Sequence, residues 1–97
     1  MNKDIKSLIE YPNEGVLSKE LVKDKMNVSL FCMAKGTEIS DHTSTKQGFV
    51  YVLEGNGTFN LEGEDIKMLP STFIFMKENA VHSLKAEENT AFILALT

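Results

Sequence analysis

The sequence predicts an all-β chain, folded as a small antiparallel double-sheet β-barrel, and two observations support this prediction. Seven short segments are rich in β-branched and aromatic residues, and turn-forming residues bound each of them. These segments follow one another at short and even intervals, which is typical of antiparallel sandwiches and barrels. The 97 residues are enough for one hydrophobic core, so a single domain is expected.

Only the start of the chain shows a helical pattern. Ile5, Leu8 and Ile9 would share one face of a helix, so a short helix is expected in an N-terminal segment, residues 1–10. The barrel domain is expected to span residues 11–97. Its strands are expected at residues 16–22, 27–34, 49–53, 57–61, 72–76, 81–85 and 91–96. Cys32 falls on the second of these strands, where a buried packing role is predicted because free cysteine is among the most buried residues.

Two glycine-containing segments predict tight turns between strands. One is Glu54-Gly-Asn-Gly57, and the other is Glu62-Gly-Glu-Asp65. Glycine and asparagine accept the positive φ that tight hairpin turns require. Each segment is therefore interpreted as the turn of a β-hairpin.

Composition and charge exclude several classes of function. The net charge is −4, and all ten basic residues are lysines that lie among acidic residues rather than in a cluster. A nucleic-acid partner is therefore not expected, and the guanidinium clamp that often binds phosphate or carboxylate groups is missing. No apolar stretch is long enough to cross a bilayer, so no membrane partner is expected. The single cysteine and the lack of a secretion-signal pattern favour a cytoplasmic protein.

The chain has two histidines, and each stands in its own motif. The first motif has a glycine, a histidine, a serine and two further glycines, at Gly36, His42, Ser44, Gly48 and Gly55. The second has a proline, an asparagine and a histidine, at Pro70, Asn79 and His82. Together they resemble the two-part signature of the cupin superfamily, which reads Gly, five residues, His-x-His, Glu and Gly, then Pro-Gly and a last His. The resemblance covers roughly residues 11–97. It implies a jelly-roll β-barrel of a small single-domain branch that is mostly uncharacterised.

The resemblance also implies where a metal would bind. In metal-binding cupins three histidines and the glutamate hold one divalent ion inside the barrel. His42 and His82 match the first and last of these ligands, whereas Ser44 stands at the second histidine and Gly48 at the glutamate. The metal site is therefore expected to be degenerate, because catalytic metal sites usually keep three protein ligands. The expected cofactor is none, or a weakly held divalent transition metal.

Strand alternation predicts which side chains join the histidines. Side chains point alternately to the two faces of a strand. If Gly48 faces inward, the next two residues on its face also do, and His82 likewise brings its neighbours two positions away. The predicted ligand pocket comprises His42, Ser44, Gly48, Val50, Val52, Ala80, His82 and Leu84. Asn79 stands at the family's glycine position, and it is the non-glycine residue best able to adopt left-handed geometry.

Two functions are open at this point. The first is a small-molecule-binding protein of unassigned activity, whose histidines are buried polar residues hydrogen-bonded to each other, or to Ser44 and water. The second is a metal-dependent enzyme, dioxygenase- or isomerase-like, that uses His42 and His82 with water or a nearby acid. The nearby acids are Glu38, Asp41, Glu54 and Glu78, and none occupies the family's glutamate position. A structural or sensing subunit that has lost its chemistry is a third alternative. No independent catalytic signature is present, so no catalytic residue is assigned.

The opposite face of the strand at residues 49–53 predicts a second partner. Phe49, Tyr51 and Leu53 point away from the predicted pocket. Together with an N-terminal strand they offer a surface for pairing. A homodimer is therefore expected, and the expected partners are a small-molecule ligand and a second copy of the chain.

Overall fold

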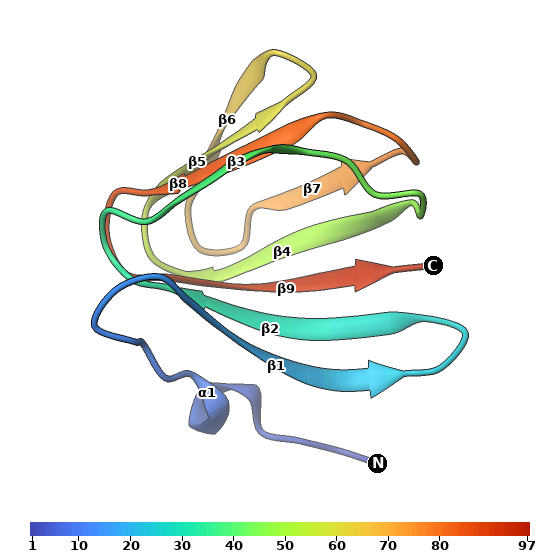
Figure 1. Cartoon of the computed structure of the whole chain (residues 1–97). Helices are drawn as coiled ribbons and strands as arrows, with labels where there is room; N and C mark the ends of the chain where they lie inside the picture. The colour runs from blue at the N-terminus through green and yellow to red at the C-terminus, as the bar shows by residue number, and fades with distance from the viewer.

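A computed structural model describes the whole chain, residues 1–97, as nine strands and one short helix (Figure 1). The helix is α1 (Ile5–Leu8). The strands are β1 (Val16–Lys23), β2 (Asn27–Met33), β3 (Glu38–His42), β4 (Gly48–Glu54), β5 (Gly57–Leu61), β6 (Glu64–Met68), β7 (Phe73–Met76), β8 (His82–Ala86) and β9 (Thr90–Leu96). All seven predicted strands are present. Two more, β3 and β6, were not predicted.

The strands form two antiparallel sheets that face each other, which confirms the predicted fold class (Figure 1). One sheet has five strands in the order β1-β2-β9-β4-β7, and the other has four in the order β3-β8-β5-β6. Neighbours within a sheet are mostly distant in sequence, so the chain crosses repeatedly between the two sheets. The helix α1 lies outside, beneath the five-stranded sheet (Figure 1). No helix is long and apolar enough to span a membrane.

The main core fills the space between the sheets. It consists of ten buried residues, namely Met33, Val50, Val52, Phe59, Met68, Ile74, Met76, Leu84, Ala86 and Phe92. Phe59, Val50 and Val52 are at most 1% exposed. The predicted inward orientation of the two valines is therefore confirmed. Burying side chains of this size contributes roughly 1.5–3 kcal/mol each, so this layer dominates the stability of the fold.

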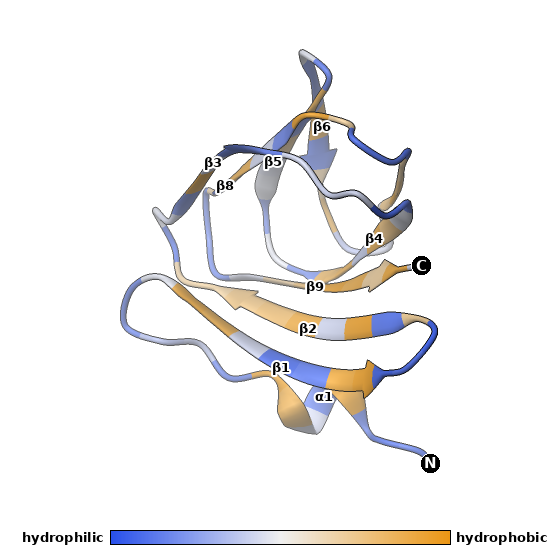
Figure 2. Cartoon of the chain, turned by 45° about the vertical axis from the view of Figure 1, so that its right-hand side comes forward, coloured by the Kyte–Doolittle hydropathy of each residue, from blue (hydrophilic) through white to orange (hydrophobic).

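A smaller core lies on the outer face of the five-stranded sheet. Leu30, Cys32 and Ala91 are fully buried there, which confirms the predicted packing role of the cysteine. The N-terminal segment covers them with four apolar side chains, those of Ile5, Leu8, Ile9 and Tyr11. The apolar stripe of the short helix thus packs as its spacing predicts. Figure 2 shows the result, with hydrophobic residues on both β2 and β9 and on the segment next to β1.

Only one of the two predicted hairpins exists. Glu62 and Gly63 connect β5 to β6 with φ values of 50° and 87°, as a tight two-residue hairpin turn requires. The prediction for Glu54-Gly-Asn-Gly57 was wrong, because β4 pairs with β7 and β9 whereas β5 pairs with β6 and β8. This turn instead carries the chain from one sheet to the other. A Cβ on Gly55 would lie 2.5 Å from Thr90 Cα, so the glycine is explained by close packing against the start of β9.

The two strands that the sequence did not predict lack the usual composition. The strand β3 reads Glu-Ile-Ser-Asp-His, with only one β-branched apolar residue. The strand β6 begins immediately after the Glu62-Gly63 turn and is mostly charged. Both lie in the four-stranded sheet, where pairing with β8 and β5 rather than strand propensity stabilises them.

Candidate functional site

A β-bulge in β3 brings the two histidines together. The strand pairs with β8, and His42 lies directly opposite His82, while Ile39 lies opposite Leu84. Between these two pairs, Ser40 and Asp41 of β3 lie opposite the single residue Ser83 of β8, which is the count expected at a bulge. The bulge lets Ile39 and His42 both face the interior. Asp41 lines the outer side of the sheet, on the face opposite to His42.

The imidazole rings of His42 and His82 are in contact. Their centroids are 4.0 Å apart and the ring planes are tilted by 60°. On its other side, the ring of His82 stacks on Phe59, with centroids 5.6 Å apart and an angle of 6° between planes. His82 is buried, at 6% exposure, whereas His42 is exposed. One histidine therefore lies inside the barrel and the other at its mouth.

Hydrogen bonds determine which nitrogen of each ring is free. His42 Nδ1 lies 2.9 Å from the carbonyl oxygen of Ser40, and His82 Nδ1 lies 3.0 Å from that of Ala80. A carbonyl oxygen only accepts, so in each neutral ring Nδ1 carries the hydrogen and donates it. Both Nε2 atoms then keep an unprotonated lone pair. The hydrogen bonds between the histidines and Ser44, one of the predicted alternatives, are absent, and the Ser44 hydroxyl accepts from the backbone N–H of Lys46.

Burial also keeps His82 neutral. Desolvation lowers the pKa of His82 below its ordinary value, and the neighbouring His42 lowers it further. The hydrogen bond to the carbonyl of Ala80 acts in the opposite direction but is the smaller effect. At neutral pH the His82 imidazole is therefore uncharged, which is the state needed for an acceptor, a general base or a metal ligand.

This lowered pKa predicts a pH-dependent stability. The unfolded chain binds a proton at His82 more readily than the folded chain does, so stability is complete above the unfolded pKa of about 6.5 and declines as the pH falls below it. Urea unfolding at a series of pH values, in the presence of a chelator, should show this decline. We expect a shallower decline in His82→Gln. Equal slopes in the two proteins between pH 5 and 7 would contradict the prediction.

The histidine pair borders a small apolar cavity of about 60 Å³. Its lining consists of Phe31, Ile39, His42, Val50, Phe59, Met76, His82, Leu84, Phe92 and Leu94. Four residues of the predicted pocket are among these, namely His42, Val50, His82 and Leu84. The remaining four lie elsewhere: Val52 and Ala80 are buried away from the cavity, Gly48 is packed against β9, and Ser44 is in the loop after β3.

Six lining residues were not predicted as part of the pocket. They come from β2, β3, β5, β7 and β9, whose pairing partners were unknown from the sequence alone. Alternation was visible in these segments, but it could not show which face meets the histidines. Asn79 has a φ of 64°, which confirms the left-handed geometry predicted before His82.

Gly48, which stands at the family's glutamate position, has no room for a side chain. A Cβ at this position would collide with the backbone carbonyl of Ala95 and would lie 2.8 Å from Leu96 Cδ2. Gly48 is paired with Leu96 on one side and Met76 on the other, at the start of β4. The close approach of backbone β9 therefore requires glycine here.

The donor atoms around the cavity do not fit a four-ligand metal centre. Two imidazoles and the thioether of Met76 are the only side-chain heteroatoms in its lining. Nowhere in the chain do three His, Cys, Asp or Glu side chains gather as metal ligands would. Of the acids near the motif, Glu38 and Asp41 line the outer side of the four-stranded sheet, and Glu54 accepts a hydrogen bond from Tyr11.

Sequence comparison assigns the family. Residues 29–96 match the family model of the cupin domain. The chain belongs to the cupin family. The match includes both histidines and seven complete strands of the structure, from β3 to β9. None of the curated proteins matches the sequence of this cupin.

Solved structures show the same fold at low sequence identity. A conserved protein of unknown function from Streptococcus pyogenes, SPY1581, has a TM-score of 0.89 and 23% identity, covering 100% of this chain and 86% of its own. A cupin superfamily protein from Desulfitobacterium hafniense has a TM-score of 0.86 and 21% identity, covering 93% and 84%. A salicylate 1,2-dioxygenase from Pseudoaminobacter salicylatoxidans has a TM-score of 0.80 and 19% identity. The match covers 84% of this cupin but only 26% of the dioxygenase. These similarities concern the fold.

Proposed function

We propose that this cupin binds a small, neutral or weakly polar molecule through His42 and His82. One observation carries the proposal. Both Nδ1 atoms are engaged with backbone carbonyls, so both Nε2 lone pairs are left for a ligand beside an apolar cavity. Binding sites of this kind combine an apolar lining with a few polar groups that orient the ligand.

The cavity restricts the chemistry of that ligand. A volume of about 60 Å³ is well below the roughly 150 Å³ that holds a benzene-sized molecule. The ligand, or the part of it that enters, therefore has only a few non-hydrogen atoms. Because two neutral imidazole nitrogens accept but do not donate, it should carry at least one hydroxyl, amine or protonated acid group. The absence of a cationic side chain in the lining disfavours a charged phosphate or carboxylate.

A metal-dependent enzyme is the second candidate, favoured by the same pair of Nε2 atoms. Histidine ligands commonly donate their other ring N–H to a carbonyl, as both histidines do here. The chain supplies two nitrogen ligands and, from Met76, one thioether, so any metal would be held weakly or by solvent as well. A thioether would favour a soft ion such as Cu(I) over the oxygen-preferring ions. Dioxygenase- or isomerase-like chemistry belongs to this candidate.

One experiment on untagged protein separates the two candidates. Long-range ¹H–¹⁵N spectra of the histidine rings report Nε2 directly, while elemental analysis reports bound metal. For a small-molecule site we expect substoichiometric metal, and Nε2 shifts when alcohols, amines or acids of a few heavy atoms are added. For a metal site we expect stoichiometric uptake of an added transition ion.

The variants His42→Gln and His82→Gln should abolish either response, with His42→Gln the less disruptive because that ring is exposed. Met68→Leu is the matched control for Met76→Leu, since Met68 is a buried core residue that does not line the cavity. Loss of metal uptake in Met76→Leu alone would support the thioether as a ligand. If neither small molecules nor metal ions perturb Nε2, the site binds no ligand of either kind and the proposal is wrong.

A further inference from the structure

The turn between β5 and β6 contains a glutamate where its backbone conformation favours other residues. Glu62 has a φ of 50° and Gly63 a φ of 87°, so both central residues of the turn are left-handed. Asparagine, aspartate and glycine are the usual residues at the first of these two positions. A different residue persists in this region when the surrounding structure holds it there. A contact of the Glu62 side chain should therefore explain its presence.

Glu62 makes two hydrogen bonds to Val81, the residue before His82. Its backbone N–H donates to the Val81 carbonyl oxygen over 2.9 Å, and its carboxylate Oε1 accepts from the Val81 N–H over 3.3 Å. Leu61 and His82 are the last pair in the ladder of β5 and β8, so Glu62 and Val81 are the next pair beyond it. In a regular antiparallel ladder the backbone carbonyl of Glu62 would accept from the Val81 N–H. Here the carboxylate takes the place of that carbonyl.

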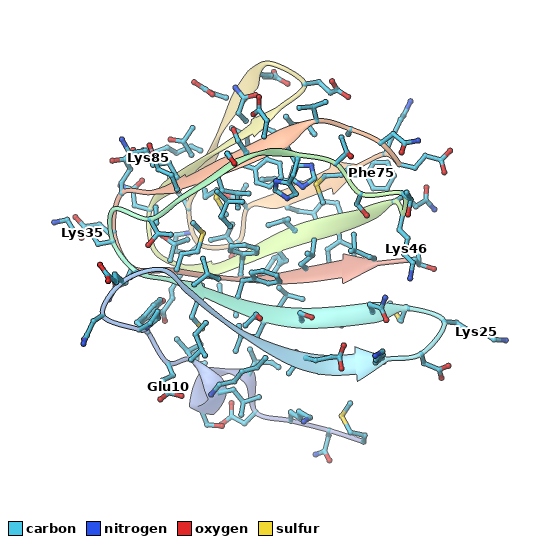
Figure 3. All side chains as sticks on the ribbon, viewed as in Figure 1. Glu10, Lys25, Lys35, Lys46, Phe75 and Lys85 are labelled. Atoms are coloured by element: carbon cyan, nitrogen blue, oxygen red, sulfur yellow. The ribbon has the colours of Figure 1, made fainter.

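Glu62 is also the one residue whose side chain holds the backbone in front of His82. The N–H groups of residues 79 and 80 donate to backbone carbonyls, which any residue could supply. The contact with Val81 differs, because it needs a side-chain oxygen of the correct reach. Figure 1 shows the turn between β5 and β6 beside the start of β8, and Figure 3 shows oxygen-bearing side chains around this turn, at the top of the molecule.

The backbone of Val81 determines the hydrogen bond that fixes the His82 ring. His82 Nδ1 donates to the carbonyl oxygen of Ala80, two residues earlier, over 3.0 Å. Val81 is the only residue between them, so its torsion angles determine whether this bond can form. Hydrogen bonds at both the N–H and the carbonyl of Val81 restrict those angles. Because the bond at Nδ1 determines which ring nitrogen carries the hydrogen, the same restriction keeps the Nε2 lone pair free.

We propose that Glu62 is a positioning residue for His82, which it holds in the Nδ1–H tautomer through Val81. The inference rests on the proposed function, because it concerns the Nε2 atom that would contact a ligand. Glu62 is exposed and does not line the cavity, so it acts through the backbone and not by touching the ligand. It lies between the two histidine motifs rather than in either of them.

Three substitutions separate this role from a purely structural role in the turn. Glu62→Ala removes the acceptor, and Glu62→Gln keeps an acceptor oxygen at the same reach. Glu62→Asn separates the two roles, because asparagine suits the left-handed turn but is one methylene too short for Val81. We expect Glu62→Asn to unfold at the same urea concentration as the wild-type protein or at a higher one. If Glu62 only stabilised the turn, this variant would leave His82 unchanged.

Long-range ¹H–¹⁵N spectra report the tautomer of His82 at a pH where the rings are neutral, and His42→Gln assigns the signals. We expect the Nδ1–H form in the wild-type protein and in Glu62→Gln. In Glu62→Ala and Glu62→Asn we expect a mixture of tautomers, with roughly fivefold faster exchange of the Val81 amide, as loss of one hydrogen bond implies. An unchanged tautomer in both of these variants would overturn the proposal, as would a Glu62→Gln protein that behaves like Glu62→Ala.

A ligand titration separates failure of this inference from failure of the proposed function. Ethanol is the probe, because it is small and carries one hydroxyl. Only the Nδ1–H form offers the Nε2 lone pair, so the dissociation constant of ethanol should rise a few-fold in Glu62→Asn. Equal binding by Glu62→Asn and the wild-type protein would overturn the role of Glu62 and leave the proposed function intact. If ethanol shifts Nε2 in neither protein while the tautomers differ as expected, the role of Glu62 is supported and the proposed function is not.

Discussion

Replacing Gly48 by glutamate is expected to destabilise this cupin severely and to leave it without a metal centre, although the change restores the family's glutamate. Any Cβ at this position collides with the carbonyl of Ala95, which is backbone and has little freedom to move. Overpacking of this kind costs about 3 kcal/mol for Gly48→Ala. Glutamate should cost more, because its carboxylate would also lose hydration in an apolar environment. Denaturant unfolding measures the cost, and elemental analysis measures the metal.

The matched control is Gly63→Asn. Gly63 has open space around it and a φ of 87°, in a turn that asparagine tolerates. We expect its free energy of unfolding to change by less than about 1 kcal/mol. A Gly48→Glu protein with wild-type stability and stoichiometric metal would show that β9 moves away readily. The degenerate site would then result from one substitution rather than from the packing of the sheet.

Replacing Phe59 by alanine is expected to remove the largest single contribution to the core beside the histidines. Phe59 is 1% exposed and stacks on His82. Truncating a buried phenylalanine to alanine costs about 3–5 kcal/mol, which is a large share of the roughly 5–15 kcal/mol that stabilises a domain of this size. Urea unfolding should show this loss. Phe59→Leu should cost less, since it leaves a smaller cavity.

The same replacement has a functional consequence. Phe59 lines the cavity, so its removal enlarges the apolar space next to the Nε2 atoms. We expect Phe59→Ala, but not the wild-type protein, to be stabilised by benzene-sized molecules, as dry apolar cavities of sufficient volume are. The midpoint of thermal unfolding with and without saturating benzene measures this. A variant that is not stabilised would indicate that neighbouring side chains collapse into the space.

Gly48 and Phe59 together determine what the barrel interior can accept. The lack of space at Gly48 excludes a carboxylate side chain from the interior, and the small volume of the cavity excludes a large ligand. What remains is a pair of imidazoles whose Nε2 atoms can accept hydrogen bonds or bind a soft ion. The site is therefore defined as much by what its packing excludes as by the histidines themselves.

Much of this architecture is predictable from the amino-acid sequence alone. Seven of nine strands and the buried role of Cys32 follow from local patterns. The inward phase of Val50 and Val52 and the left-handed Asn79 follow from local patterns once the cupin motif is aligned with the sequence. These features depend on the alternation of side chains along one strand, or on the φ that one residue accepts. This information lies within a few consecutive residues, so it can be inferred from the sequence.

The remaining features depend on contacts between segments that are far apart in the chain. Three features result from contact with a distant strand. They are the bulge that turns His42 toward His82, the passage of the chain between the two sheets at Gly55, and the lack of space for a side chain at Gly48. Likewise, the acceptors of both Nδ1 hydrogens and the apolar lining of the cavity exist only after the two sheets have packed. Local periodicity shows which face a side chain takes, but it cannot show which strand lies opposite. In this protein, the identity of the opposite strand decides what the histidines can bind.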